Sequence, residues 1–171
     1  MNARIPVVNE QDEVIGYRIR RELQPGDIFR VTGLWIYDTE GTILLARRAE
    51  TKALHPGLWA LGVAGTVEEG ETYDSNIVKE MGEEIGLIGY TPIFLNKELR
   101  DTHGSGLRRF ASHYAVTIPH DYPFKLKEDE VAEVKWFTPS EIDQAVTEHP
   151  ELFVPTFILY YKDFLYADSH R

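Results

Sequence analysis

The 171-residue sequence contains no cysteine. This absence excludes disulfide bonds, thiolate metal sites and every mechanism that uses a cysteine nucleophile. Long hydrophobic runs are missing as well, since no apolar stretch approaches the ~20 residues that span a bilayer. Residues 1–6 also lack the apolar core of a secretory signal peptide. We therefore expect a cytoplasmic protein with no membrane partner.

Positive charge is scarce. The chain has 18 Lys and Arg residues against 28 Asp and Glu residues, which gives a formal net charge of -10. Proteins that bind nucleic acids through their phosphates normally present a basic face, so this balance argues against a nucleic-acid partner. An acidic net charge does not exclude a small phosphate ester as substrate, because acidic side chains bind Mg²⁺ and the ion in turn holds the phosphate.

The length corresponds to roughly one domain, and we read residues 1–171 as a single unit. Strand and helix patterns are mixed without strict alternation, which predicts an α/β fold with a mixed β-sheet. The expected strands are 7–9 and 14–17 (an N-terminal hairpin), 29–37, 42–46, 59–67 (a strand pair or bend), 91–98, 107–117 and 131–137. The expected helices are 18–24, 72–85, 139–147 and 155–166, with a loop at 47–57 and a turn at 103–106.

The helix expected at 72–85 carries an acidic face. Glu80 and Glu84 are four residues apart and Glu83 follows Glu80 by three, so three carboxylates share one face. Glu83 and Glu84 also lie in the last turn, where the helix dipole favours cations, and Gly82 costs about 1 kcal/mol relative to Ala. A divalent cation would reverse the charge terms, because Mg²⁺ and Mn²⁺ prefer carboxylate oxygens. The alternative interpretation is a solvated acidic surface.

This segment resembles the Nudix box, a pattern of glycine, glutamate, arginine and aliphatic residues with two fixed gaps. The matching positions are Gly65, Glu71, Glu80, Met81, Glu83, Glu84, Gly86 and Leu87. Lys79 stands where the family has arginine. The resemblance covers a core of residues 29–166, with 1–28 as an N-terminal hairpin extension. It implies the Nudix α/β/α sandwich with a mixed β-sheet.

The resemblance implies a Nudix hydrolase that cleaves the diphosphate linkage of a nucleoside diphosphate joined to another group. Mg²⁺ or Mn²⁺ is the implied cofactor. The implied metal ligands are Glu80, Glu83, Glu84 and the backbone carbonyl of Ala64, and Glu83 and Glu84 are also implied to be catalytic. Glu71 is expected to pair with Lys79 and so orient the helix, although lysine lacks the bidentate fork of arginine.

Two further groups are candidate site residues. The cations just before the box, which could hold substrate phosphates through charge-assisted hydrogen bonds, are Arg47, Arg48 and Lys52. Their alternative is a solvated loop. Glu130 falls where some family members place a further metal-binding or general-base glutamate, so it is a third catalytic candidate. Its neighbours Glu128 and Asp129 compete for that role, and plain surface charge is the other interpretation.

The N-terminal hairpin and the basic stretch at 47–52 look like the Nudix subgroup related to isopentenyl-diphosphate isomerase. That isomerase needs a cysteine acid/base and histidine metal ligands. This chain has Ala64 at the cysteine position and Thr66 and Phe29 at histidine positions. The resemblance therefore implies a hydrolase-like site on an isomerase-like scaffold.

A second function remains open: a non-catalytic Nudix-fold module that senses nucleotides or binds protein. Lys79 and Gly82 favour it, whereas the complete set of glutamates favours the hydrolase. An RNA-decapping role is disfavoured by the acidic balance. The expected partner is a small nucleotide-type diphosphate, with ADP-ribose, other nucleotide sugars, dinucleotide cofactors and damaged nucleoside triphosphates as candidates. A homodimer is a candidate assembly.

Overall fold

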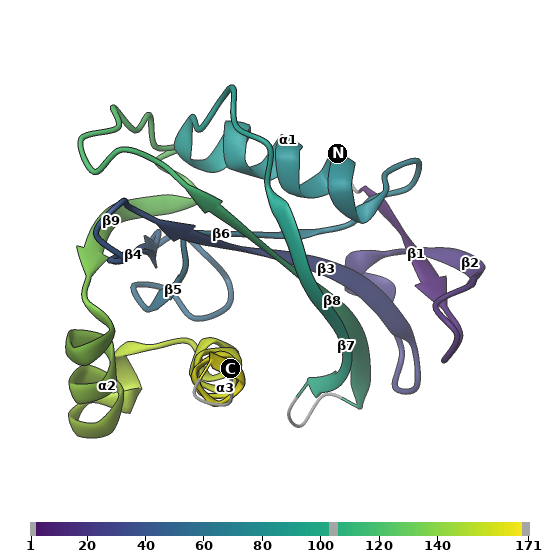
Figure 1. Cartoon of the computed structure of the whole chain (residues 1–171). Coiled ribbons are helices and arrows are strands. Elements are labelled where there is room, and N and C mark those ends of the chain that lie inside the picture. Colours follow the sequence, from purple (N-terminus) through teal and green to yellow (C-terminus); the bar gives the residue numbers. More distant parts are fainter. Residues whose placement is uncertain (1–2, 103–105, 169–171) are drawn as a thin grey trace. The chain divides into compact units, whose positions relative to one another are not determined.

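The structure is a computed structural model that describes residues 3–102 and 106–168. Over these residues the chain forms a mixed α/β fold with a mixed sheet and three α-helices, which confirms the predicted fold class (Figure 1). The strands are β1 (Arg4–Val8), β2 (Val14–Ile19), β3 (Ile28–Tyr37), β4 (Ile43–Arg48), β5 (Trp59–Leu61), β6 (Val63–Thr66), β7 (Ile93–Thr102), β8 (Leu107–Thr117) and β9 (Val131–Phe137). The helices are α1 (Tyr73–Ile85), α2 (Pro139–Glu148) and α3 (Pro155–Asp168), with 3-10 turns η1 (Arg20–Glu22) and η2 (Pro150–Leu152).

Two elements differ from the sequence-based expectation. The helix expected at 18–24 is reduced to the single 3-10 turn η1. Arg47 and Arg48, expected in a loop, lie at the end of β4 because the ladder with β9 continues to the pair Arg48↔Val131. Of the expected turn at 103–106, residues 103–105 lie outside the described residues. No helix in the described part of the chain is long and apolar enough to cross a membrane.

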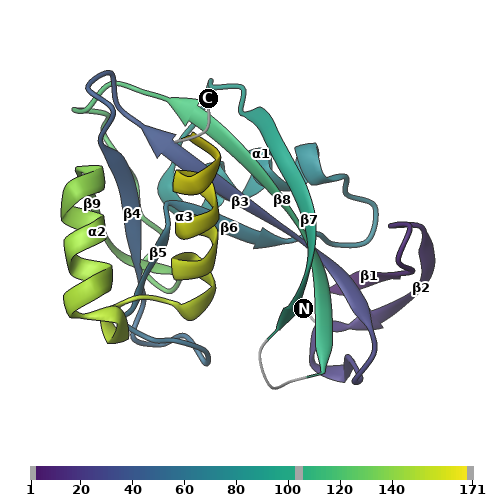
Figure 2. The same cartoon turned by 60° about the horizontal axis from the view of Figure 1, so that its bottom comes forward.

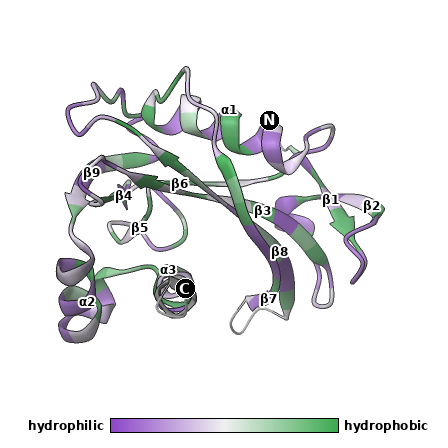
Figure 3. Ribbon diagram, in the orientation of Figure 1, coloured by the Kyte–Doolittle hydropathy of each residue, from purple (hydrophilic) through white to green (hydrophobic). Residues whose placement is uncertain are grey.

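The chain forms two compact units, of which the first comprises Met1–Trp35, Val63–Glu83 and Leu87–Val116. In this unit β1 pairs antiparallel with β2, and β7 pairs antiparallel with β8. β3 pairs antiparallel with β6, from Val31↔Thr66 to Leu34↔Val63. The helix α1 buries Ile77 and Met81, four residues apart, while hydrophilic residues alternate with them along its length (Figure 3). This helix therefore has one apolar stripe that packs into the core.

The second unit comprises Ile36–Gly62, Glu84–Gly86 and Thr117–Arg171. β4 lies between β9 and β5 and pairs antiparallel with both. α2 begins with a capping box, in which the Thr138 hydroxyl accepts from Glu141 N and the Glu141 carboxylate accepts from Thr138 N. α2 and α3 lie side by side (Figure 2), and Tyr161 Oη donates to Pro139 O at 2.9 Å. Tyr161 also stacks on Phe157 in the aromatic core of this unit.

The turn between β3 and β4 is organised by a buried carboxylate, Asp38, which is 3% exposed. It accepts hydrogen bonds from Glu40 N at 3.0 Å and Thr42 N at 2.8 Å, and it contacts His120 Nδ1 at 2.7 Å. Burial alone would raise the pKa of Asp38. The hydrogen bonds from His120 and Thr42 outweigh burial and hold that pKa well below its ordinary value of 3.8.

Asp38→Asn should lower the free energy of unfolding by about 1–3 kcal/mol at neutral pH, because one acceptor oxygen and the charge are lost. The pKa of Asp38 is lower in the folded state than in the unfolded state, so its stabilisation is complete above about pH 5 and fades as the pH falls below about 4. Urea unfolding of both proteins between about pH 6 and pH 3 should therefore show a shrinking difference. A difference that stays constant over this range would contradict the assignment.

Candidate active site

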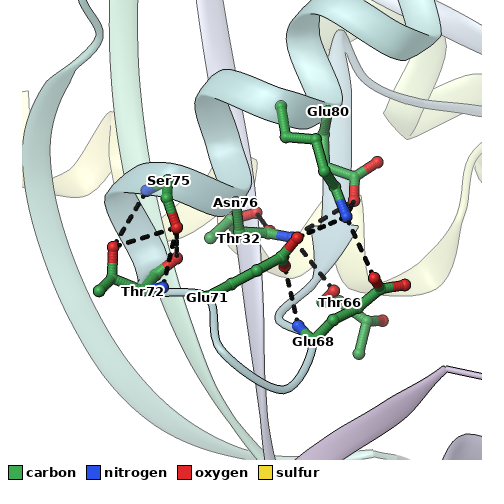
Figure 4. Close-up of polar contacts among 9 residues, drawn as sticks. Thr32, Thr66, Glu68, Glu71, Thr72, Ser75, Asn76 and Glu80 are labelled. Atoms are coloured by element: carbon green, nitrogen blue, oxygen red, sulfur yellow. Dashed lines mark hydrogen bonds and ion pairs between the residues drawn. The ribbon is translucent and has the colours of Figure 1, made fainter.

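Helix α1 is fixed at both ends by local hydrogen bonds. At its start, Thr72 Oγ1 accepts from Ser75 N at 3.1 Å, and Ser75 Oγ accepts from Thr72 N at 2.9 Å (Figure 4). At its end, Gly86 takes a φ of +69°, and Leu87 N donates to Met81 O at 2.9 Å. The backbone of the box helix is thus held in place from Thr72 to Leu87.

Asn76 connects α1 to the strands beneath it. The residue is fully buried, and its Nδ2 donates to Thr66 O at 3.1 Å and to Glu71 Oε2 at 2.8 Å. Nδ2 also lies 3.3 Å from Glu80 Oε1, and Oδ1 accepts from Thr32 Oγ1 at 2.5 Å (Figure 4). One amide therefore fixes two box glutamates against β3 and β6.

Lys79 makes the expected pair with Glu71, at 2.6 Å from Nζ to Oε1. The same ammonium lies 3.4 Å from Glu68 and 3.4 Å from Glu80, so one cation serves three carboxylates. Burial opposes the charge on Glu71, but hydrogen bonds from Lys79, Glu68 N and Asn76 outweigh it and lower the pKa of Glu71. Burial also opposes the charge on Lys79, but its carboxylate neighbours raise its pKa.

Glu80 is less well compensated than Glu71. Burial raises the pKa of Glu80, Lys79 opposes this shift, and the charges of Glu83 and Glu71 add to it. Glu80 also packs on Gly65, where a Cβ atom would come within 2.4 Å of Glu80 Cγ. Glycine at this position is therefore a packing requirement of the helix–strand contact.

The other implied metal ligands lie on the same helix and on β6. Glu83 is exposed and Glu84 is half-buried in the last turn of α1. Ala64 is exposed on β6, where it pairs with Gly33. Across residues 3–102 and 106–168, no three His, Asp or Glu side chains are already grouped as a metal-binding set. As a donor set, three carboxylates and a carbonyl fit a hard divalent cation.

The predicted phosphate-binding cations of the second unit all have protein partners. Arg47 binds Glu133 at 3.0 Å and Glu50 at 3.3 Å, and Arg48 Nε donates to Leu54 O at 3.0 Å. Lys52 forms an ion pair with Glu130. The fold thus brings together Lys52, which we predicted to bind phosphate, and Glu130, which we predicted to be catalytic. Glu130 is half-buried, whereas its competitors Glu128 and Asp129 are exposed.

Sequence reasoning missed Asn76 and Asp12. Asp12, in the turn between β1 and β2, accepts from Arg30 Nε at 2.7 Å and Lys97 Nζ at 2.5 Å. Tyr73 Oη donates to the same carboxylate at 3.0 Å, so the N-terminal hairpin contacts the first residue of α1. Burial alone would raise the pKa of Asp12, but the bonds from Lys97 and Arg30 lower it. An acidic residue within a polar turn gave no signal of these distant partners.

Residues 28–157 match the model of the NUDIX domain. A curated relative, described as an uncharacterized Nudix hydrolase YfcD from Salmonella typhi, is 33% identical over 139 residues, which cover 81% of this chain and 73% of the relative. An isopentenyl-diphosphate Delta-isomerase from Cereibacter sphaeroides is 32% identical over 125 residues, or 71% of each chain. The chain belongs to the Nudix hydrolase family, as the resemblance to the Nudix box implied, and an isopentenyl-diphosphate isomerase is among its relatives.

Solved structures share this fold. DR0079 from Deinococcus radiodurans has a TM-score of 0.71 and 24% identity, and covers 85% of this chain and 90% of its own. The NUDIX domain of Shewanella oneidensis NrtR, solved as a complex with ADP ribose, has a TM-score of 0.58 and 15% identity, covering 80% and 88%. At these identities the likeness concerns the fold alone.

Gly82, within α1, and Gly65, on the strand β6 that packs against α1, should respond in opposite ways to substitution by alanine. A Cβ on Gly82 meets no atom within 4 Å, so Gly82→Ala should raise the free energy of unfolding by about 1 kcal/mol. Gly65→Ala should lower it by about 1–3 kcal/mol through overpacking against Glu80 and Asn76. Urea unfolding of the two variants measures both effects, and equal signs would contradict the packing described for α1.

Lys79→Met should lower the free energy of unfolding by about 1–3 kcal/mol, because Glu71 loses its closest cation in a half-buried site. Lys79→Arg should retain stability. Lys79 lowers the pKa of Glu71 below the ordinary 4.5. The ion pair therefore stabilises the folded state above about pH 4.5, and this stabilisation is lost as the pH falls below that value. Chemical unfolding at neutral and acid pH tests this, and a Lys79→Met deficit that grows in acid would contradict the pairing.

Proposed function

We propose that this Nudix protein is a hydrolase dependent on a divalent metal ion, and that it cleaves the diphosphate linkage in a nucleoside diphosphate joined to another group. One observation carries the proposal. Glu80 is held between Gly65, Asn76 and Lys79 on a helix whose next residues include Glu83 and Glu84. The solved Nudix domain that binds ADP ribose supports a nucleotide-type substrate.

Glu80, Glu83, Glu84 and the Ala64 carbonyl would hold Mg²⁺ or Mn²⁺. When bound, the ion polarises the phosphoryl group and makes water more acidic near neutral pH. The chain's own contribution is to place the glutamates, because Asn76 and Lys79 fix Glu71 and Glu80 through hydrogen bonds that exist without substrate.

The cations Arg47, Arg48 and Lys52 are proposed to contact substrate phosphates. Each already binds an oxygen of the protein, so a phosphate must compete with or share those contacts. An ammonium has three donors and can share. Glu130 is proposed as the further acidic residue, because Lys52 and the backbone bond from Ala49 N to Glu130 O hold it in place.

The hydrolase is favoured over the non-catalytic module by Lys79. Lysine in place of the family's arginine would favour the non-catalytic module only if Lys79 failed to pair with Glu71. Lys79 instead makes the pair with Glu71 that the arginine is expected to make.

Glu84→Gln tests the assignment with a minimal change of shape. We expect at least a 10²-fold loss of turnover, because the phosphoryl charge loses part of its counter-charge. Stability without metal should rise by a few tenths of a kcal/mol as repulsion with Glu80 is relieved. The matched control is Glu148→Gln, in the last turn of α2, where the carboxylate contacts only Gln144 among the bonds described.

The assay offers ADP-ribose, a nucleotide sugar, a dinucleotide cofactor and a nucleoside triphosphate, each with Mg²⁺ or Mn²⁺, and measures released monophosphate or phosphate. EDTA should abolish the activity and added metal should restore it. Full activity in EDTA, or equal turnover in Glu84→Gln and wild type, would refute the mechanism. Binding without turnover of any substrate in the panel would favour the sensing module.

A further inference from the structure

The strand β7 forms an edge of the first unit. Among the described residues it pairs with β8 alone, over ten residues from Ile93 to Thr102. Its register is irregular between Phe94 and Asn96 and regular from Asn96 onward. A long edge strand presents unpaired backbone donors and acceptors, which a second strand can satisfy. The seven residues 96–102 are therefore a regular segment with one open side.

The charges of this segment are antisymmetric about Leu99, so that residues at equal distances on its two sides carry opposite charges. Lys97 and Glu98 precede Leu99, and Arg100 and Asp101 follow it, so the signs read plus, minus, leucine, plus, minus. When such a segment pairs antiparallel with a copy of itself about Leu99, every charge meets its opposite. Lys97 faces Asp101 of the second copy, and Glu98 faces Arg100. No charge meets its like.

The faces of the strand agree with this register. Successive residues point to opposite faces, and directly opposed residues of an antiparallel pair share a face. Lys97, Leu99 and Asp101 lie on one face and Glu98 and Arg100 on the other, so each opposed pair is matched in face as well as in sign. A register shifted by two residues would centre the pairing on Glu98 or Arg100, and that residue would then oppose its own like charge in the second copy.

Of the four charged side chains, Lys97 and Asp101 are exposed, and Glu98 and Arg100 are half-buried. The side chain of Asp101 is 85% exposed and its contact with Arg108 is long, at 3.7 Å. The ammonium of Lys97 contacts Asp12 and has two further donors. Glu98 and Arg100 pair with each other along the strand at 2.7 Å, so two copies would build an alternating network of four charges.

We propose that β7 is a homodimer interface, in which the edges of two copies of this chain pair antiparallel about Leu99 and continue the sheet across a two-fold axis. The occupant is a second copy, because the segment's charge pattern is complementary to itself. This inference does not depend on the proposed hydrolase activity, and its tests measure association alone.

A charge-swap pair provides the first test. Asp101→Lys makes positions 97 and 101 both positive, and Lys97→Asp makes both negative. Each variant alone should associate at least about tenfold more weakly than wild type, because two attractive pairs become repulsive. An equimolar mixture should form a heterodimer. Sedimentation equilibrium against the 19.6 kDa monomer mass measures all four samples.

Lys97→Ala is the control for the lost Asp12 contact: it should not associate with Asp101→Lys as strongly as Lys97→Asp does. The melting temperature of each variant checks that it is folded. A wild type that stays monomeric at every concentration up to about 1 mM, or a mixture that associates no better than its parts, overturns the proposal.

The absence of cysteine allows a second test that needs no charge change. About a two-fold axis at Leu99, the two Leu99 Cα atoms lie about 4.5–5.5 Å apart, within the range of a disulfide. Leu99→Cys should form a covalent dimer under mild oxidation. Asn96→Cys, on the same edge, should not, because the two copies of residue 96 lie about 20 Å apart in this register. Equal cross-linking of the two variants refutes the register.

Discussion

The contact between α1 and β6 at Gly65 is the constraint on which the candidate site depends. A side chain at this position would collide with Glu80 and Asn76, so the helix lies against the strand at a distance that only glycine permits. At this distance Asn76 is fully buried and reaches Thr66, Glu71 and Glu80 with one amide. The box glycine and the box glutamates are therefore parts of one packing arrangement.

The electrostatics of the helix follow from this packing. A helix with glutamates in its last turn opposes its own dipole, and Lys79 is shared by three carboxylates within 3.4 Å. Glu71 receives the short bonds and its pKa falls, whereas Glu80 receives the long ones and its pKa rises with burial. Local rules of helix stability are thus broken along the acidic face of α1, which is typical of functional sites.

Local patterns predicted much of this arrangement, and tertiary contacts decided the rest. The four-residue spacing of Ile77 and Met81 is typical of a buried helical stripe, and α1 buries both residues. The resemblance to the Nudix box implied the pair between Lys79 and Glu71, and the two side chains form it. Asn76 gave no signal, because its partners on β3 and β6 meet it only after the strands pair. Asp12 likewise binds residues 18, 61 and 85 positions away. The pair between Lys52 and Glu130 also required the fold, since 78 residues separate them.

The similarity to isopentenyl-diphosphate isomerase shows that related chains can share a scaffold and differ in the residues that carry the chemistry. About a third of the aligned residues are shared with such an isomerase, yet Ala64 stands at the position where the resemblance places a cysteine. A methyl group cannot move a proton to or from carbon. The strand retains a backbone carbonyl at this position, and a carbonyl together with the carboxylates of α1 is a donor set that suits a divalent cation, which can in turn hold a phosphate. The chain thus shares the scaffold of the isomerase without the side chain on which proton transfer at carbon depends.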